Sequence, residues 1–105
     1  MKKTLRLGTC SGRHPLPVEE FLFHPDKGDP IDERGAVVVD VATAPRVTAK
    51  RVEAFLKAHP DVTEVNLYYT GLTEVTVVTI RELEKNGVRV TPYRYNRDTG
   101  EYEPY

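Results

Sequence analysis

Several features that mark particular classes of protein are scarce or missing in this sequence of 105 residues. Its one cysteine, Cys10, excludes an internal disulfide, and no spaced set of cysteines and histidines forms a zinc motif. No run approaches the roughly 20 apolar residues of a membrane-spanning helix, and no apolar segment of signal-peptide length follows the basic residues 2–3. We therefore expect a cytoplasmic protein that does not enter a membrane.

A large excess of charge of one sign is missing too. The formal net charge is −1, so the chain as a whole attracts neither long nucleic acid nor an anionic membrane surface. An anionic ligand would have to be held by a local cluster of cations and hydroxyl groups. Acidic residues are scarce at the predicted strand ends, so the sequence predicts no metal site and no cofactor.

The common nucleotide-binding and hydrolase motifs are absent. Gly8 and Gly12 do not form the Gly-x-Gly-x-x-Gly fingerprint, and no Walker loop with Gly-Lys-Ser/Thr is present, which argues against a dehydrogenase or an ATPase. The nucleophile elbow Gly-x-Ser-x-Gly is also missing, which argues against a hydrolase built on Ser11, His14 and Asp40.

The composition that is present is ordinary. Hydrophobic residues make up 39% and charged residues 30% of the chain, which is typical of a globular protein and not of a disordered one. This length is enough for one hydrophobic core and too short for two, so we predict a single domain over residues 1–105.

Apolar periodicity predicts strands alternating with helices. Residues 35–41 are β-branched and apolar on both faces, as expected of a central parallel strand. Residues 15–34 contain four prolines and are predicted to be irregular, with at most a turn or two of helix at 18–23. The full set of predicted elements is strands at 4–8, 35–41, 62–69, 88–95 and 101–105 and helices at 49–59 and 74–86.

This order of elements is a βαβαβ pattern with an N-terminal strand and a C-terminal β-hairpin. Right-handed crossovers then predict a small Rossmann-like α/β domain of three layers with a mainly parallel sheet. On the first helix, charged residues including Arg51 are expected to face solvent, opposite an apolar face that contains Phe55.

Hydroxyl, small and cationic residues follow three of the predicted strands. Because the carboxyl ends of parallel strands meet at one edge, where open α/β sheets bind ligands, we expect these residues to form a phosphate or nucleotide site. The candidate catalytic residues are Ser11, Arg13 and His14, and the candidate ligand-binding residues are Thr9, Cys10, Gly12, Arg46, Thr70, Gly71 and Thr73.

Each of these residues also has a structural explanation that the sequence leaves open. Thr70 or Thr73 can simply cap the following helix, and residues 9–12 can be an ordinary turn. Arg13 can pair with a nearby carboxylate. Cys10 is as well placed to be a small buried residue as to be a thiolate nucleophile.

Tyrosine is concentrated in the C-terminal part of the chain, where all six tyrosines lie. Their rings can stack on nucleobases, or they can line a dimer interface. These residues are Tyr68, Tyr69, Tyr93, Tyr95, Tyr102 and Tyr105.

A strand ending in Thr70-Gly71, followed by a helix, a strand and the segment Tyr-Asn-Arg-Asp-Thr-Gly-Glu-Tyr, resembles the CARF domain (CRISPR-associated Rossmann fold). Residues 8–12 also resemble the first ligand loop of that family. The resemblance covers residues 4–14 and 62–103. In the family the second turn is usually Thr-Gly-Gly-Thr-Lys, so Leu72 and Glu74 depart from it, and an acid at position 74 repels a phosphate.

The resemblance implies a homodimer that binds a cyclic oligoadenylate, a cyclic oligonucleotide second messenger, across its two-fold axis. With no effector domain attached, the chain resembles stand-alone members that act as ring nucleases. In these, the ligand's own 2′-hydroxyl attacks the adjacent phosphate without a metal. The residues that match the two ligand loops are Thr9, Ser11, Gly12, Thr70, Gly71 and Thr73.

To this match we add the cations Arg13 and Arg46, and His14 as the group that protonates the leaving 5′-oxygen. Two other functions stay open. One is a non-enzymatic interaction module of a defence or phage system, which binds a partner through the tyrosine-rich hairpin and has its strand ends covered by residues 15–34. The other is a small-molecule phosphatase or hydrolase, which needs a histidine or an acid within hydrogen-bond reach of Cys10 or Ser11.

Overall fold

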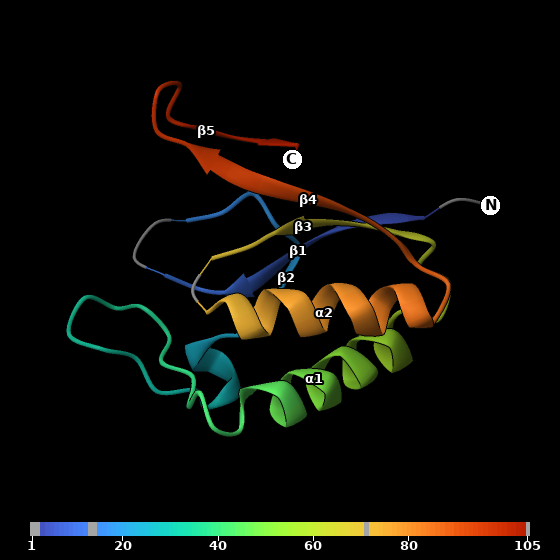
Figure 1. Cartoon of the computed structure of the whole chain (residues 1–105), viewed down its shortest axis with the longest axis horizontal. Coiled ribbons are helices and arrows are strands. Elements are labelled where there is room, and N and C mark those ends of the chain that lie inside the picture. Colours follow the sequence, from blue (N-terminus) through green and yellow to red (C-terminus); the bar gives the residue numbers. More distant parts are fainter. Residues whose placement is uncertain (1–2, 13–14, 71, 105) are drawn as a thin grey trace.

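The computed structural model describes residues 3–12, 15–70 and 72–104. Within them the chain forms strands, two α-helices and one short 3-10 helix, η1, which are shown along the chain in Figure 1. In chain order the elements are β1 (Thr4–Cys10), β2 (Glu20–Phe23), η1 (Pro25–Lys27), α1 (Ala44–Ala58), β3 (Glu64–Tyr68), α2 (Thr73–Lys85), β4 (Arg89–Asn96) and β5 (Glu101–Pro104).

The strands form one five-stranded sheet in the order β2-β1-β3-β4-β5. β1 is parallel to both of its neighbours, β2 and β3, and β3 is parallel to β4. β4 and β5 form an antiparallel hairpin, in which Tyr95 lies opposite Tyr102. The predictions of a mainly parallel sheet and of a C-terminal β-hairpin are therefore confirmed.

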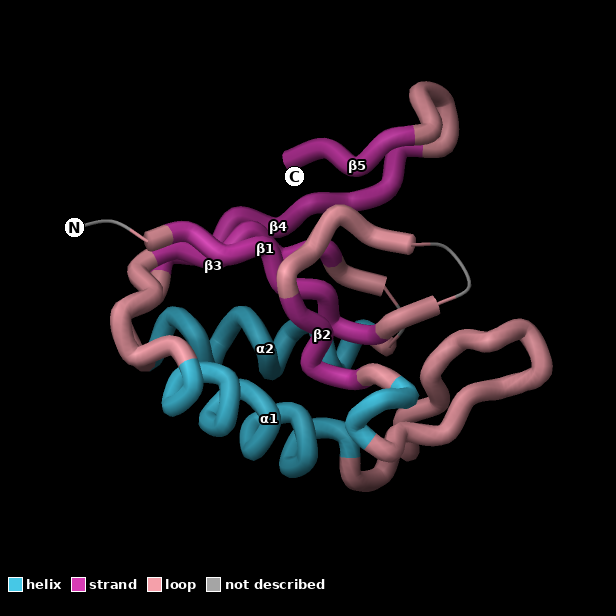
Figure 2. The backbone as a smooth tube through the Cα atoms, turned by 180° about the vertical axis from the view of Figure 1, so that it is seen from behind, coloured by secondary structure: helices cyan, strands magenta, loops and turns pink. Residues whose placement is uncertain are grey.

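Both α-helices lie on the same side of the sheet and pack against each other (Figures 1 and 2). The described part of the chain thus forms one layer of helices and one layer of sheet, and the predicted three-layer arrangement is not confirmed. Residues 15–19, which lead into β2, lie on the opposite side of the sheet from the helices (Figure 2).

The predicted central strand at residues 35–41 is wrong. These residues form only an isolated bridge, between Ile31 and Val37, and the side chains of Val38 and Val41 are 49% and 58% exposed. The start of this segment belongs to a tight turn, in which the Asp32 carboxylate accepts hydrogen bonds from the backbone N–H groups of residues 34 and 36. β-branched residues favour a strand only where a neighbouring strand offers a free edge.

The place beside β1 is taken instead by β2, where the sequence predicted at most a turn or two of helix. Phe21 of β2 lies opposite Gly8 of β1. A Cβ atom at Gly8 would lie 2.6 Å from the Phe21 ring, so the ring fits only because Gly8 has no side chain. The pairing of β1 with β2 therefore depends on the packing of Phe21 against Gly8, two residues that are not neighbours in the sequence.

The helices bury one stripe each. α1 begins at Ala44, five residues before the predicted start, with a proline in its first turn. Its buried residues are spaced three or four apart, as are those of α2, so one face of each helix packs on the sheet. The α2 prediction is confirmed despite its β-branched composition. The buried stripes are Ala44, Thr48, Val52 and Phe55 on α1 and Val75, Thr79 and Leu83 on α2.

Candidate functional site

The carboxyl ends of β1 and β3 lie next to each other in the sheet, because the two strands are parallel neighbours. Residues 15–19, which lead into β2, lie on the side of the sheet away from the helices, whereas α2, the helix after β3, covers the other side (Figure 2). Neighbouring strands whose connections leave on opposite faces create a crevice at their carboxyl ends, where open α/β sheets bind ligands. This edge is the candidate site.

Thr9 and Thr70 join the two loops at this edge. The Thr9 hydroxyl donates to the Thr70 carbonyl and accepts from the Thr70 backbone N–H, each over 2.9 Å. The Thr70 hydroxyl donates to the Cys10 carbonyl over 2.8 Å. Thr9 is fully buried. Both predicted ligand-binding hydroxyls are thus engaged in holding the loops together.

Ser11 and Cys10 are also buried at the end of β1. The backbone N–H of Ser11 donates to the Phe23 carbonyl, and its carbonyl accepts from Val37, each over 3.0 Å. Residues around Val37 therefore cover this end of the strand. Burial, followed by the nearby charge of Asp29, raises the pKa of the Cys10 thiol to about 11, against a smaller lowering by its hydrogen bond with Thr9. A pKa raised in this way disfavours the thiolate form and argues against Cys10 as a thiolate nucleophile.

Other predicted site residues are placed differently. Gly12 and Thr73 are exposed at this edge, next to the end of β1 and at the first residue of α2. Arg46 belongs to the first turn of α1 and lines a groove between α1 and α2. It therefore does not join the strand ends as predicted, because the strand expected to lead into its loop does not form. Arg13, His14 and Gly71 lie outside the described residues.

The start of α2 is not capped by a side chain. The N-cap residue is Leu72, and neither Thr70 nor Thr73 supplies a capping hydrogen bond within the described residues. The first N–H groups of the helix therefore keep their capacity to bind an anion, in line with the helix dipole. Glu74 in the first turn acts against such binding by its charge.

Four of the tyrosines, Tyr68, Tyr93, Tyr95 and Tyr102, form an aromatic cluster on the face of the sheet away from the helices. Tyr68 stacks on Tyr93 with ring centroids 4.7 Å apart, and it also contacts Tyr102 at 5.5 Å. Tyr95 meets Tyr102 edge to face at 5.4 Å and is 52% exposed. Burial raises the pKa of both Tyr68 and Tyr102, with a further contribution from a neighbouring tyrosine in each case.

A groove of about 470 Å³ borders this cluster and is lined by Pro15, Tyr95, Gly100 and Tyr102. Pro15 follows the end of β1, and Gly100 belongs to the hairpin that follows β4, so the groove lies near the carboxyl ends of parallel strands. The sequence analysis noted the tyrosines but not this groove. A hairpin with a four-residue loop would have placed Tyr95 opposite Tyr102, whereas the approach of Pro15 has no sequence signal.

Arg51 does not face solvent as predicted. Its guanidinium group forms two hydrogen bonds to the Asp29 carboxylate, of 2.9 and 2.7 Å, and a third of 2.9 Å to the Leu22 carbonyl. It also lies 4.7 Å from the centre of the Phe23 ring. Burial by itself would raise the pKa of Asp29, but the hydrogen bonds from Arg51 and from the His24 backbone N–H lower it below its usual value. This pair fastens the loop after β2 to α1.

Within residues 3–12, 15–70 and 72–104, no three His, Cys, Asp or Glu side chains are grouped so that they could hold a metal ion. Over the same residues, no helix is both long and apolar enough to cross a membrane.

The chain matches no protein-family model, no curated protein and no solved structure. The CARF resemblance therefore stays a prediction, and the site is argued from the residues of this chain alone.

Proposed function

We propose that the protein binds a nucleotide of the cyclic oligoadenylate type at the carboxyl ends of β1 and β3. The observation that supports this most directly is the groove lined by Pro15, Tyr95, Gly100 and Tyr102, which borders the aromatic cluster near the carboxyl ends of parallel strands. An adenine base would lie against the rings of Tyr95 and Tyr102. The binding would take place in the cytoplasm, where the sequence predicts the protein to reside.

Ring stacking provides the main binding energy in this proposal. Half of the Tyr95 surface is exposed, while Tyr102 is held in place by contacts with Tyr68 and Tyr95. Stacking of a base on such a ring contributes about 1–3 kcal/mol. Since the rings are already ordered against each other, little side-chain entropy is lost when a base binds.

The phosphates would be held by the uncapped N–H groups at the start of α2, which begins directly after the β3 loop. The proposal includes a homodimer, because a cyclic oligonucleotide has rotational symmetry and two copies related by a two-fold axis would each present the same groove to it. The cyclic oligoadenylate class of the ligand is taken from the CARF resemblance, and the ring size is left to the titration.

Cleavage of the ring is the second part of the proposal. The ligand's 2′-hydroxyl would attack the adjacent phosphorus, a cyclic 2′,3′-phosphate would form, and the 5′-oxygen would leave and take up a proton. We assign the nucleophile to the ligand because the raised pKa of Cys10 disfavours its thiolate form and Ser11 is 8% exposed. The residues proposed as proton donor and cation, His14 and Arg13, lie outside the described part of the chain.

Calorimetric titration with cyclic tri-, tetra- and hexa-adenylate tests the proposal. One ring should bind per dimer, and Tyr95→Ala should weaken binding about 5- to 150-fold, as the stacking energy of about 1–3 kcal/mol requires. Tyr95→Phe keeps the ring and is the matched control, with near-normal affinity. Chromatography of the same mixtures shows whether linear products form. If a folded protein gives no heat with any of these rings, the proposal is wrong.

A protein-interaction module is the second candidate function, and a specific observation favours it. Residues around Val37 cover the end of β1, and Thr9, Cys10 and Ser11 are buried, as expected if the strand ends are closed. In that case the exposed ring of Tyr95 would contact a protein partner. Two results together would support the interaction module: no nucleotide binding by the wild type, and a change in oligomeric state on Tyr95→Ser. Analytical ultracentrifugation measures the second.

A further inference from the structure

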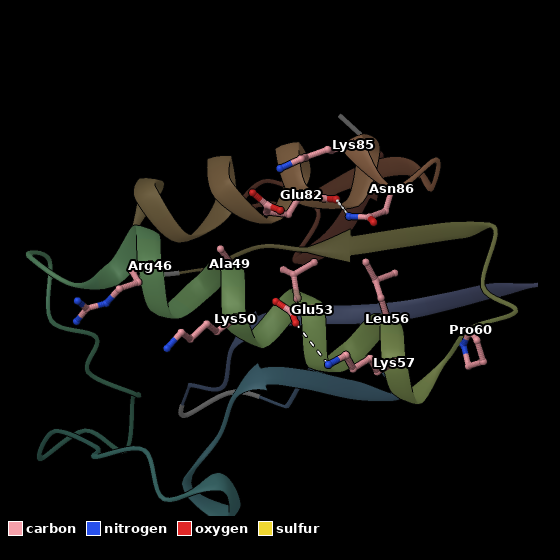
Figure 3. A pocket seen from close by; sticks show the side chains of 11 residues that line it. Arg46, Ala49, Lys50, Glu53, Leu56, Lys57, Pro60, Glu82, Lys85 and Asn86 are labelled. Carbon is pink, nitrogen blue, oxygen red and sulfur yellow. Dashed lines mark hydrogen bonds and ion pairs between the residues drawn. The ribbon is translucent and has the colours of Figure 1, made fainter.

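A second groove lies between the two helices, away from the aromatic cluster. It measures about 840 Å³ and runs along neighbouring flanks of α1 and α2 (Figure 3). The apolar part of its lining is Ala49, Val52 and Leu56 on α1 and Pro60 after it. The polar part is Arg46, Lys50, Glu53 and Lys57 on α1 and Glu82, Lys85 and Asn86 at the end of α2.

The charge of this groove differs from that of the whole chain. Four cationic side chains line it against two acidic ones, while the chain as a whole has a net charge of −1. Lys57 is paired with Glu53 at 3.5 Å, one helical turn away. Within the described residues Arg46, Lys50 and Lys85 have no ion-pair partner. The groove therefore presents an apolar floor with unpaired cations at its margins.

We propose that this groove binds an acidic amphipathic helix of a partner protein. The partner's apolar stripe would pack on Leu56 and Ala49, and its flanking Asp or Glu side chains would lie near Arg46, Lys50 and Lys85. α1 has 15 residues, so the groove matches a helix of about 22 Å, or roughly four turns. The three helices would then form a layer with ordinary interhelical spacing.

The residues that line the groove favour an acidic helix over a nucleic acid or an anionic membrane surface. Among the described residues, no aromatic side chain lines the groove, so this lining offers no stacking surface for single-stranded nucleic acid. Glu53 and Glu82 within it disfavour an anionic membrane surface or a nucleic acid backbone, which need a continuous positive field. An acidic helix can place one carboxylate beside each of the three cations, Arg46, Lys50 and Lys85. Its apolar face would also cover the apolar floor, which water otherwise contacts.

The test uses a synthetic 18-residue fluorescent peptide, alanine-rich, with leucine at helical spacing and glutamate on both flanks. Its control is the same peptide with lysine in place of each glutamate. Anisotropy titrations with the full-length protein should show binding of the acidic peptide only, weakened by salt. The combined reversal Arg46→Glu, Lys50→Glu and Lys85→Glu should weaken that binding by about 3- to 100-fold or more and allow the basic peptide to bind.

The matched control reverses two exposed arginines outside the groove, Arg34→Glu and Arg97→Glu, and should leave peptide binding unchanged. Leu56→Asp tests the apolar floor and should weaken binding in a protein that circular dichroism shows to be folded. The proposal is overturned if the folded wild type does not bind the acidic peptide, or if the triple reversal has no more effect than the control. It is also overturned if the three cations bind anionic vesicles, an oligonucleotide or a second copy of the chain in preference to the peptide.

Discussion

The Thr9 side chain and the Thr70 backbone form a closed pair, in which one hydroxyl both donates to the carbonyl and accepts from the N–H of the same residue. The two residues are 61 positions apart in the sequence. They tie the end of β1 to the loop that leads into α2. The geometry of the candidate site therefore depends on the buried Thr9 hydroxyl, together with the Thr70 hydroxyl that donates to the Cys10 carbonyl.

We expect Thr9→Val to lower the free energy of unfolding by about 1–3 kcal/mol, because it removes the hydrogen-bond partner of two partly buried backbone groups of Thr70. Urea denaturation followed by circular dichroism measures this. Thr9→Ser keeps the hydroxyl and is the control, with a smaller loss from the missing methyl group. Equal stability of Thr9→Val and the wild type would contradict the structural role given to this pair.

Gly8 offers a second test of how the sheet is built. Gly8→Ala should lower the free energy of unfolding by about 1–3 kcal/mol, since the new Cβ would lie 2.6 Å from the Phe21 ring. Gly12→Ala is the matched control and should be close to neutral, because no atom of the described residues lies within 4 Å of its added Cβ. Combining Gly8→Ala with Phe21→Leu should recover part of the loss, as measured in a double-mutant cycle. An additive double mutant would show that the two residues do not meet.

The Arg51–Asp29 pair should make stability depend on pH. The folded protein holds the pKa of Asp29 below its ordinary value of 3.8. Its contribution is therefore complete above about pH 5, where the carboxyl is ionised in the unfolded chain too. It is lost as the pH falls through the lowered folded pKa.

We expect Asp29→Asn to be less stable than the wild type at pH 7 by about 1–3 kcal/mol, because an amide accepts less strongly from a guanidinium group than a carboxylate does. The difference should shrink as the pH falls below 4. Urea denaturation at pH 7, 5 and 3 measures it, with Asp32→Asn as a control carboxylate that has no cation partner within the described residues. A difference that is constant across this range would contradict the assignment.

Glu74 tests the phosphate part of the proposed function. Glu74→Gln removes a negative charge from the first turn of α2 and should strengthen the binding of cyclic tetra-adenylate about 2- to 5-fold, as a helix-terminus charge of about 0.3–1 kcal/mol predicts. Glu84→Gln, in the last turn of the same helix, is the matched control and should have little effect. If both variants bind alike, the start of α2 is not near the phosphates.

The sequence analysis expected the loops after residues 4–8 and 62–69 to meet at one edge of a parallel sheet. Thr9, Cys10, Ser11 and Thr70 lie at such an edge because β1 and β3 are parallel neighbours, a pairing that the sequence alone did not establish. The sequence did not predict that the Thr9 and Thr70 hydroxyls would bond to backbone groups. That outcome depends on a distance between two loops, which no local pattern encodes.

Local chemistry alone determined the elements that can be recognised without a partner. The stop at Asn86 and Gly87, where Gly87 has φ 78°, ends α2 because only glycine adopts this backbone conformation readily. The alternating run before the C-terminal turn gives the hairpin of β4 and β5 in the same way. These are properties of a few consecutive residues.

Tertiary structure alone decided which segment became the strand beside β1. Residues 35–41 have the stronger strand composition, yet β2 takes that edge because Phe21 fits over Gly8. Because β2 pairs with β1, Arg51, which was predicted to face solvent, instead binds Asp29. Arg46 lies in the groove between the helices and not at the strand ends. The physical reason is the relative size of two free energies. Strand propensities differ by about 1 kcal/mol between the best and the worst residues. A steric clash in the core costs about 1–3 kcal/mol, so packing outweighs propensity.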